Sequence, residues 1–94
     1  MGKSIIVDDM SQCLICGSPY PEVHHCIFGR GNRDLSDKHG LVVPLCAEHH
    51  RGNGGVHQLR DMDLGIKAMA QRAFEKKVGS RDDWMRLFGR NYLD

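Results

Sequence analysis

Apolar residues recur at steps of three and four along the second half of the chain. They are Leu59, Met62, Ile66, Met69, Ala73 and Phe74. This period places them on one face of an α-helix. Val78 followed by Gly79 is typical of a helix end, so the pattern predicts a long amphipathic helix that ends there.

A second, shorter helix is predicted directly afterwards. Ser80 and Asp83 have the Ser-x-x-acid spacing of a capping box, which marks a helix start. The apolar stripe of this last helix would consist of Trp84, Leu87 and Phe88. We interpret the apolar residues of both helices as core and assign them no chemistry.

The first half of the chain carries shorter apolar runs. Residues 22–28 contain Val, Ile and Phe, and residues 41–45 read LVVPL with Pro44 near the end. Both runs predict short β-strands, since a proline suits a strand end or edge. The joining segment GRGNRDLSDKHG is long for a hairpin loop, so we expect it to have a function. Residues 47–51 predict one helical turn, which the glycines of residues 52–55 end.

The two halves together predict a small α+β protein of one domain, residues 1–94. Residues 1–11 form a loose lead-in, residues 12–57 contain every cysteine and histidine, and residues 58–94 are a helical support. A chain this short buries little apolar area and often needs a metal or disulfides. The net charge of +1 indicates no partner, so a nucleic-acid ligand would need a local basic patch.

The compartment follows from what the chain lacks. No apolar run approaches the ~20 residues of a membrane span. The first run, SIIV, is too short for the core of a secretion signal. We therefore expect a cytoplasmic protein with no membrane partner. In a reducing compartment, clustered Cys and His residues indicate metal binding more than disulfides.

Two residue pairs have the spacing of metal ligands. Cys13 and Cys16 are separated by two residues, and so are Cys46 and His49. Three thiolates and one imidazole suit tetrahedral zinc. Four protein ligands leave no open position, so we expect this zinc to be structural. Cys26 is left over, and we interpret it as a small buried thiol.

The remaining histidines indicate a second metal. His24, His50 and His57 offer three imidazoles, and three protein ligands with an open position are typical of a catalytic ion. His25, the next residue after His24, would lie near that ion without binding it. A neutral imidazole near pH 7 can take a proton from water, so His25 is our candidate general base.

These motifs resemble those of the HNH, or ββα-metal, nucleases. The matching segments are CLIC at residues 13–16, VHHCI at 23–27, VVPLCAEHH at 42–50 and GVH at 55–57. Their order and spacing are most similar to the phage Ref-type, RecA-dependent nucleases. The resemblance implies a zinc-stabilised ββα-metal core with C-terminal helices. It also implies metal-dependent hydrolysis of DNA with low sequence specificity.

The resemblance assigns roles to individual histidines. His24 takes a metal-ligand position, His25 takes the general-base position, and His50 with His57 takes the positions of the later ligands. The sequence departs from the family pattern because RGNGG separates those two ligands more widely than H-x-x-x-H.

The middle asparagine of the HNH name is a second departure. Leu41 stands about where that residue belongs. A backbone carbonyl, His39 and Asn32 are the alternatives for the group that orients His25.

Basic residues flank the predicted site. Arg30, Arg33, Lys38 and Arg51 are the candidate phosphate contacts, and the glycines near Arg30 would let backbone amides approach phosphate. No helix rich in Arg and Asn is present to read bases, which favours weak sequence specificity or targeting by a partner. Imidazole ligands suit Zn²⁺, Ni²⁺, Co²⁺ or Mn²⁺, whereas the resemblance implies an ion such as Mg²⁺ or Mn²⁺, with which nucleases of this type often work.

The Ref-type resemblance implies DNA as substrate, a RecA filament as targeting partner and a role in phage recombination or DNA processing. Two other functions stay open. A non-catalytic zinc-finger-like module would bind nucleic acid and use only the cysteine-rich ligand set. A structural protein would use both metals to stabilise its fold.

Overall fold

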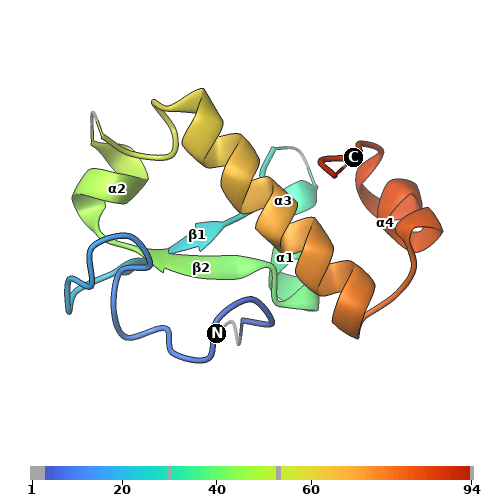
Figure 1. The fold of residues 1–94 in the computed structure, drawn as a ribbon, viewed down its shortest axis with the longest axis horizontal. Helices are drawn as coiled ribbons and strands as arrows, with labels where there is room; N and C mark the ends of the chain where they lie inside the picture. The colour runs from blue at the N-terminus through green and yellow to red at the C-terminus, as the bar shows by residue number, and fades with distance from the viewer. Residues whose placement is uncertain (1–3, 30, 53, 94) are drawn as a thin grey trace.

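In the part of the chain that is described, the protein has a two-stranded sheet and four helices (Figure 1). The computed structural model describes residues 4–29, 31–52 and 54–93. In chain order the elements are β1 (Glu22–His25), α1 (Asn32–His39), β2 (Val42–Leu45), α2 (Ala47–Arg51), α3 (Arg60–Lys77) and α4 (Arg81–Phe88). Helix α4 packs against α3 and lies away from the strands. Within these residues no helix is both long and apolar enough to cross a lipid bilayer.

The two predicted strands pair with each other in antiparallel register. Glu22 lies opposite Leu45, and His25 lies opposite Val42. The sequence predicts a strand through residue 28, whereas β1 ends at His25. Beyond that point the backbone of Ile27 bonds to a side chain of α1 and not to a neighbouring strand.

The segment between the strands is a helix, where the sequence predicts a loop. α1 lies between Gly31 (φ 78°) and Gly40 (φ 73°), both in the left-handed region that favours glycine. Ser36 anchors this helix, since its Oγ donates to Ile27 O (2.6 Å) and accepts from Ile27 N (3.3 Å). Leu35 is the one apolar side chain of α1, so hydrophobic periodicity carries no signal for it.

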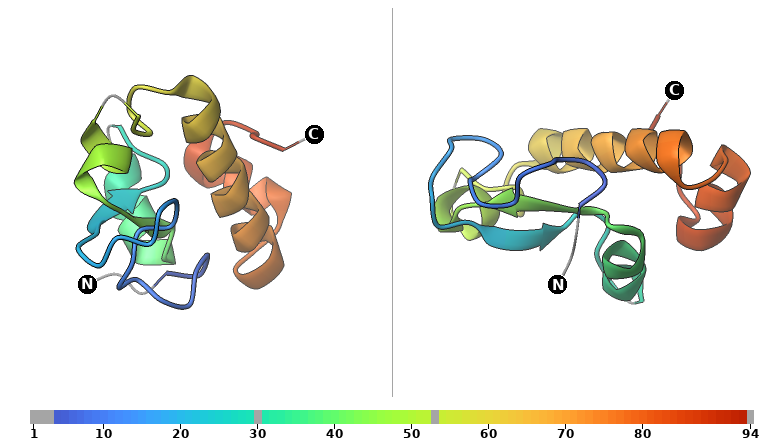
Figure 2. Two further views of the ribbon diagram at one scale, coloured as in Figure 1. Left: turned by 60° about the vertical axis from the view of Figure 1, so that its left-hand side comes forward. Right: turned by 90° about the horizontal axis from the view of Figure 1, so that it is seen from below.

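Helix α3 supplies the apolar cover of the sheet. It runs along one side of the strands, with α1 near the end of the sheet away from α2 (Figure 2). Ile66 and Phe74 are buried on its inner face, as the period predicts. Ala70, which the period does not include, is also buried, whereas the predicted Met69 and Ala73 are only partly buried. Leu59 is an exception, because it precedes the helix and is 43% exposed.

The C-terminal helix begins as predicted. Asp83 N donates to Ser80 Oγ (3.1 Å) and Ser80 N donates to Asp83 Oδ2 (3.0 Å), which completes the capping box. Trp84 is fully buried and packs against Phe74 and Phe88, with ring centroids 5.4 and 4.4 Å away.

The lead-in has no helix or strand, but it is attached to the fold. Ile5 N donates to Gly40 O (2.9 Å), and Lys77 Nζ donates to Ile5 O (2.9 Å). Ile5 and Ile6 pack against the core. Ile5 and Ile6 are therefore attached to the fold, within a lead-in that the sequence predicts to be loose.

Candidate metal centres and active site

The structure brings the four predicted zinc ligands together at one end of the sheet. The Cys13–Cys16 turn is held to β2 by Leu14 N, which donates to Pro44 O (2.8 Å). Cys46 precedes α2, and α2 carries the imidazole. We call the set of Cys13, Cys16, Cys46 and His49 the zinc clip.

Distances within the zinc clip match a tetrahedral ion. Cys16 Sγ lies 3.7 Å from Cys46 Sγ. His49 Nδ1 lies 3.7 Å from Cys13 Sγ and 3.3 Å from Cys46 Sγ. Ligands of a tetrahedral zinc, with Zn–S about 2.3 Å and Zn–N about 2.0 Å, are separated by ~3.5–3.8 Å. The donor set fits zinc in number, chemistry and spacing.

The backbone around the first cysteine favours its thiolate. Burial raises the pKa of the Cys13 thiol, but backbone N–H groups of Cys46, Cys16 and Ile15 and the ring of His49 outweigh it and lower the pKa to about 6. Because the thiolate is the form that binds metal, this turn is organised for an ion before one arrives.

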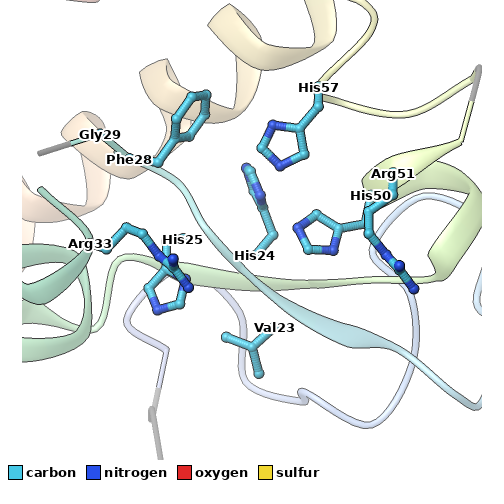
Figure 3. Close-up of a pocket in the computed structure, with 9 residues that line it drawn as sticks. All are labelled: Val23, His24, His25, Phe28, Gly29, Arg33, His50, Arg51 and His57. Carbon is cyan, nitrogen blue, oxygen red and sulfur yellow. The ribbon is translucent and has the colours of Figure 1, made fainter.

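A second cluster consists of three imidazoles from three segments. We call His24, His50 and His57 the histidine site. Their ring centroids lie 5.2 Å (His24–His50), 5.2 Å (His24–His57) and 5.1 Å (His50–His57) apart, and one ring nitrogen of each lies within 4.8 Å of the others. The rings point toward one another (Figure 3).

His24 is the buried member of the histidine site. It is 1% exposed, and its Nε2 is buried without a hydrogen-bond partner among the described residues. Burial, followed by the charges of His50 and His57, lowers its pKa to about 3. A buried, neutral and unpartnered ring nitrogen facing two further imidazoles fits a divalent ion of the kind that imidazole binds.

A carboxylate on β1 holds the α2 member of the histidine site. His50 Nδ1 lies 2.7 Å from Glu22 Oε1, and Arg51 Nε donates to the same oxygen (3.0 Å). Arg51 also donates to Glu22 Oε2 through its terminal nitrogen. Arg51, followed by His50, lowers the pKa of Glu22 below its usual value. Arg51 is therefore ion-paired, a contact that the sequence reading missed.

His25 is oriented by an aspartate of α1. Its Nε2 lies 2.8 Å from Asp37 Oδ1, and its side chain is 18% exposed. The two side-chain alternatives from the sequence are wrong. His39 packs against Phe74 (5.7 Å between ring centroids), and Asn32 Nδ2 donates to Phe28 O (3.3 Å).

A cavity of about 440 Å³ opens over these groups. It is lined by Val23, His24, His25, Phe28, Gly29, Arg33, His50, Arg51 and His57 (Figure 3). Both neighbouring histidines of β1 therefore border one space, as do Arg33 and Arg51. Lys38 is exposed and does not line the cavity, and Arg30 lies outside the described residues.

Two contributors to the site, Glu22 and Asp37, were not singled out from the sequence. Both are acidic residues in polar surroundings, and each meets its histidine partner only through tertiary folding. The one available signal was position, since Glu22 lies two residues before His24 and Asp37 lies in the segment expected to have a function.

Comparisons of the chain with protein-family models, with curated proteins and with solved structures found no match.

Proposed function

We propose that this protein is a metal-dependent endonuclease of the HNH, or ββα-metal, type that hydrolyses DNA with low sequence specificity. The observation that carries this proposal is the histidine site beside a carboxylate-oriented His25 in one open cavity. Perturbed ionisable groups that converge on a cavity are a typical feature of active sites.

The zinc clip is proposed to be structural. Its four ligands would complete the coordination of one zinc ion and leave no position for substrate. It joins the N-terminal turn to the start of α2, which carries both His49 and His50. Zinc in the clip would therefore fix the helix that offers a ligand to the histidine site.

In the histidine site, a divalent ion held by His24, His50 and His57 would supply Lewis-acid assistance to a phosphate oxygen and the 3′ leaving oxygen. The protein supplies the base. Asp37 in its carboxylate form only accepts hydrogen bonds, so Nε2 of His25 carries the proton in that pair. Nδ1 then has the free lone pair and would take the proton of the attacking water.

Arg33 is the proposed phosphate contact. It lies on α1 four residues before Asp37, which places both side chains on one face of the helix. It borders the cavity and has no ion-pair partner within the described ranges. Arg51 differs, because Glu22 already holds its guanidinium.

A plasmid-nicking assay with Mg²⁺, Mn²⁺, Ni²⁺ or Zn²⁺ tests the proposal. The wild type should cut with at least one ion, and His25→Ala should lower the rate by about 10²–10⁴, the usual contribution of a positioned general base. His39→Ala is the matched control, because His39 does not line the cavity.

The alternatives give different results in the same assay. A zinc-finger-like binding module would retain DNA without cutting it, and a purely structural protein would do neither. No cutting with any ion, on single- or double-stranded DNA and with or without a RecA filament, would overturn the nuclease proposal. Stimulation by the filament is the expected result if the Ref-type targeting applies.

A further inference from the structure

The carboxylate of Glu22 contacts both His50, a member of the histidine site, and the guanidinium of Arg51, which is not a member of that site. As the first residue of β1, Glu22 contacts two consecutive residues of α2. Its Oε1 lies 2.7 Å from His50 Nδ1 and 3.0 Å from Arg51 Nε. Its second oxygen accepts from the terminal nitrogen of Arg51. One carboxylate thus has contacts on both oxygens.

These contacts decide which nitrogen of His50 is available to a metal. An ionised carboxylate offers no proton, so the hydrogen bond requires the proton on Nδ1. The lone pair is then on Nε2, in a ring that lies 5.2 and 5.1 Å from those of His24 and His57. A ring that carries its proton on Nε2 would offer no ligand atom there, and a ring that is free to rotate would offer one only part of the time.

The guanidinium of Arg51 contacts both oxygens of the Glu22 carboxylate. A bidentate contact between an arginine and a carboxylate fixes the plane of the carboxylate as well as its charge. His50 is the more enclosed partner of Glu22, since its side chain is 17% exposed and that of Arg51 is 65% exposed. The enclosed contact orients the ring, and the exposed contact keeps Glu22 in place.

We infer that Glu22 is a positioning residue for the histidine site and that Arg51 acts on this site through Glu22. The inference rests on the proposed function only in requiring that a divalent ion binds the three histidines. It changes the role expected for Arg51 from the sequence, where its charge and position predict a phosphate contact.

Ion affinity tests the inference without using catalysis. Ni²⁺ is titrated calorimetrically into protein whose zinc clip already holds zinc. Glu22→Ala should weaken Ni²⁺ binding by about 10–100-fold, the usual effect of removing a group that orients a metal-binding histidine. Arg51→Ala should weaken it less. In the Glu22→Ala background Arg51→Ala should add nothing, because the residues act as a unit.

Controls separate positioning from stability. Glu75→Ala breaks another Glu–Arg contact, to Arg81 at 3.0 Å, outside the cavity and should leave Ni²⁺ affinity unchanged. Glu22→Gln keeps an acceptor for His50 and should retain part of the affinity, even if Glu22→Ala unfolds. A residue that only ties β1 to α2 would change the melting temperature and not the affinity of the folded protein.

Two results would overturn the inference. Wild-type Ni²⁺ affinity in folded Glu22→Ala protein would refute the positioning role and leave the nuclease proposal intact. A wild type that binds no ion beyond the clip zinc would refute both. Long-range ¹⁵N–¹H spectra of the nickel-free protein give an independent check, since His50 should carry its proton on Nδ1.

Discussion

The zinc clip and the histidine site offer related ligands in different numbers and surroundings. The clip has four donors and no room for a further one, and its ligands come from two short sequence pairs. The histidine site has three donors from three segments and borders a cavity of about 440 Å³. Completeness of coordination separates a centre that stabilises a fold from one that can act on a substrate.

The two centres also differ in the groups that support their side chains. A backbone group supports a ligand of the clip, as Ile15 N donates to Cys13 Sγ at 3.4 Å. Side-chain carboxylates support the histidines, with Glu22 beside His50 and Asp37 beside His25. Backbone support comes with a local turn, whereas carboxylate support depends on how distant segments pack. Within each of its two pairs the clip is thus built by a local turn, whereas the carboxylate contacts of the cavity join separate segments.

The largest expected effect comes from breaking the clip. Binding of a structural zinc contributes about 10–16 kcal/mol, which equals or exceeds the ~5–15 kcal/mol total stability of a typical domain. Cys13→Ser should therefore abolish the cooperative thermal transition, as measured by circular dichroism with zinc present. The matched control is Cys26→Ala, a buried thiol outside the clip, which should cost about 1 kcal/mol. Equal behaviour of the two variants would contradict the structural role of the clip.

Breaking the histidine site should leave the fold intact. His57 is exposed, so His57→Ala removes a ligand without opening a cavity in the core. The variant should keep its melting temperature while the bound metal falls from two ions to one. Cutting should slow by at least about 100-fold, since an ion supplies several kcal/mol to the transition state. Elemental analysis measures the bound metal, and plasmid nicking measures the rate of cutting. If His57→Ala unfolds the protein, the histidine site is needed for the fold as the clip is, and the proposed difference between the two centres is wrong.

The sequence predicts the parts that depend on local spacing. Two residues between ligands set the clip pairs, and antiparallel pairing of the strands brings those pairs together. The long helix and the capping box at Ser80 follow from period and side-chain chemistry. The histidine set is also predicted, and its members come from β1, from α2 and from the turn after α2.

The sequence could not predict the parts made by polar contacts between distant segments. α1 has one apolar residue and is held by Ser36 against the backbone of Ile27, so no hydrophobic pattern indicates it. Glu22 reaches a histidine 28 residues away, and Asp37 reaches one 12 residues away. Such contacts depend on tertiary placement, which neither residue type nor local spacing specifies.

A smaller effect is expected at Asp37, which acts through His25. Asp37→Ala removes the acceptor at 2.8 Å and leaves the imidazole free to turn. A displacement of about 1 Å costs ~100-fold in rate, so kcat should fall by that order while KM stays near the wild-type value. Asp37→Asn keeps an acceptor oxygen and should restore much of the rate. Asp34→Asn, at an exposed position of the same helix, is the control.

The opposite result at Asp37 would show that this carboxylate contributes to stability and not to catalysis. If the alanine and asparagine variants both lower the melting temperature and leave kcat unchanged, the carboxylate only fastens α1 to β1. The cavity would then resemble the clip, with contacts that serve stability alone.

The smallest expected effect is at Arg33, which should bind phosphate without touching either metal. A charge-assisted hydrogen bond contributes ~1.5 kcal/mol, so Arg33→Ala should weaken DNA binding by about tenfold. The slope of log K against log salt concentration should fall by the equivalent of about one phosphate contact. Anisotropy with a labelled duplex measures both in the His25→Ala background, which prevents cutting. Lys38→Ala removes a cation from the same helix but outside the cavity, and it should change affinity by less than about twofold. If Lys38→Ala weakens binding as much as Arg33→Ala, DNA follows the outer face of α1 and the cavity does not receive the phosphate.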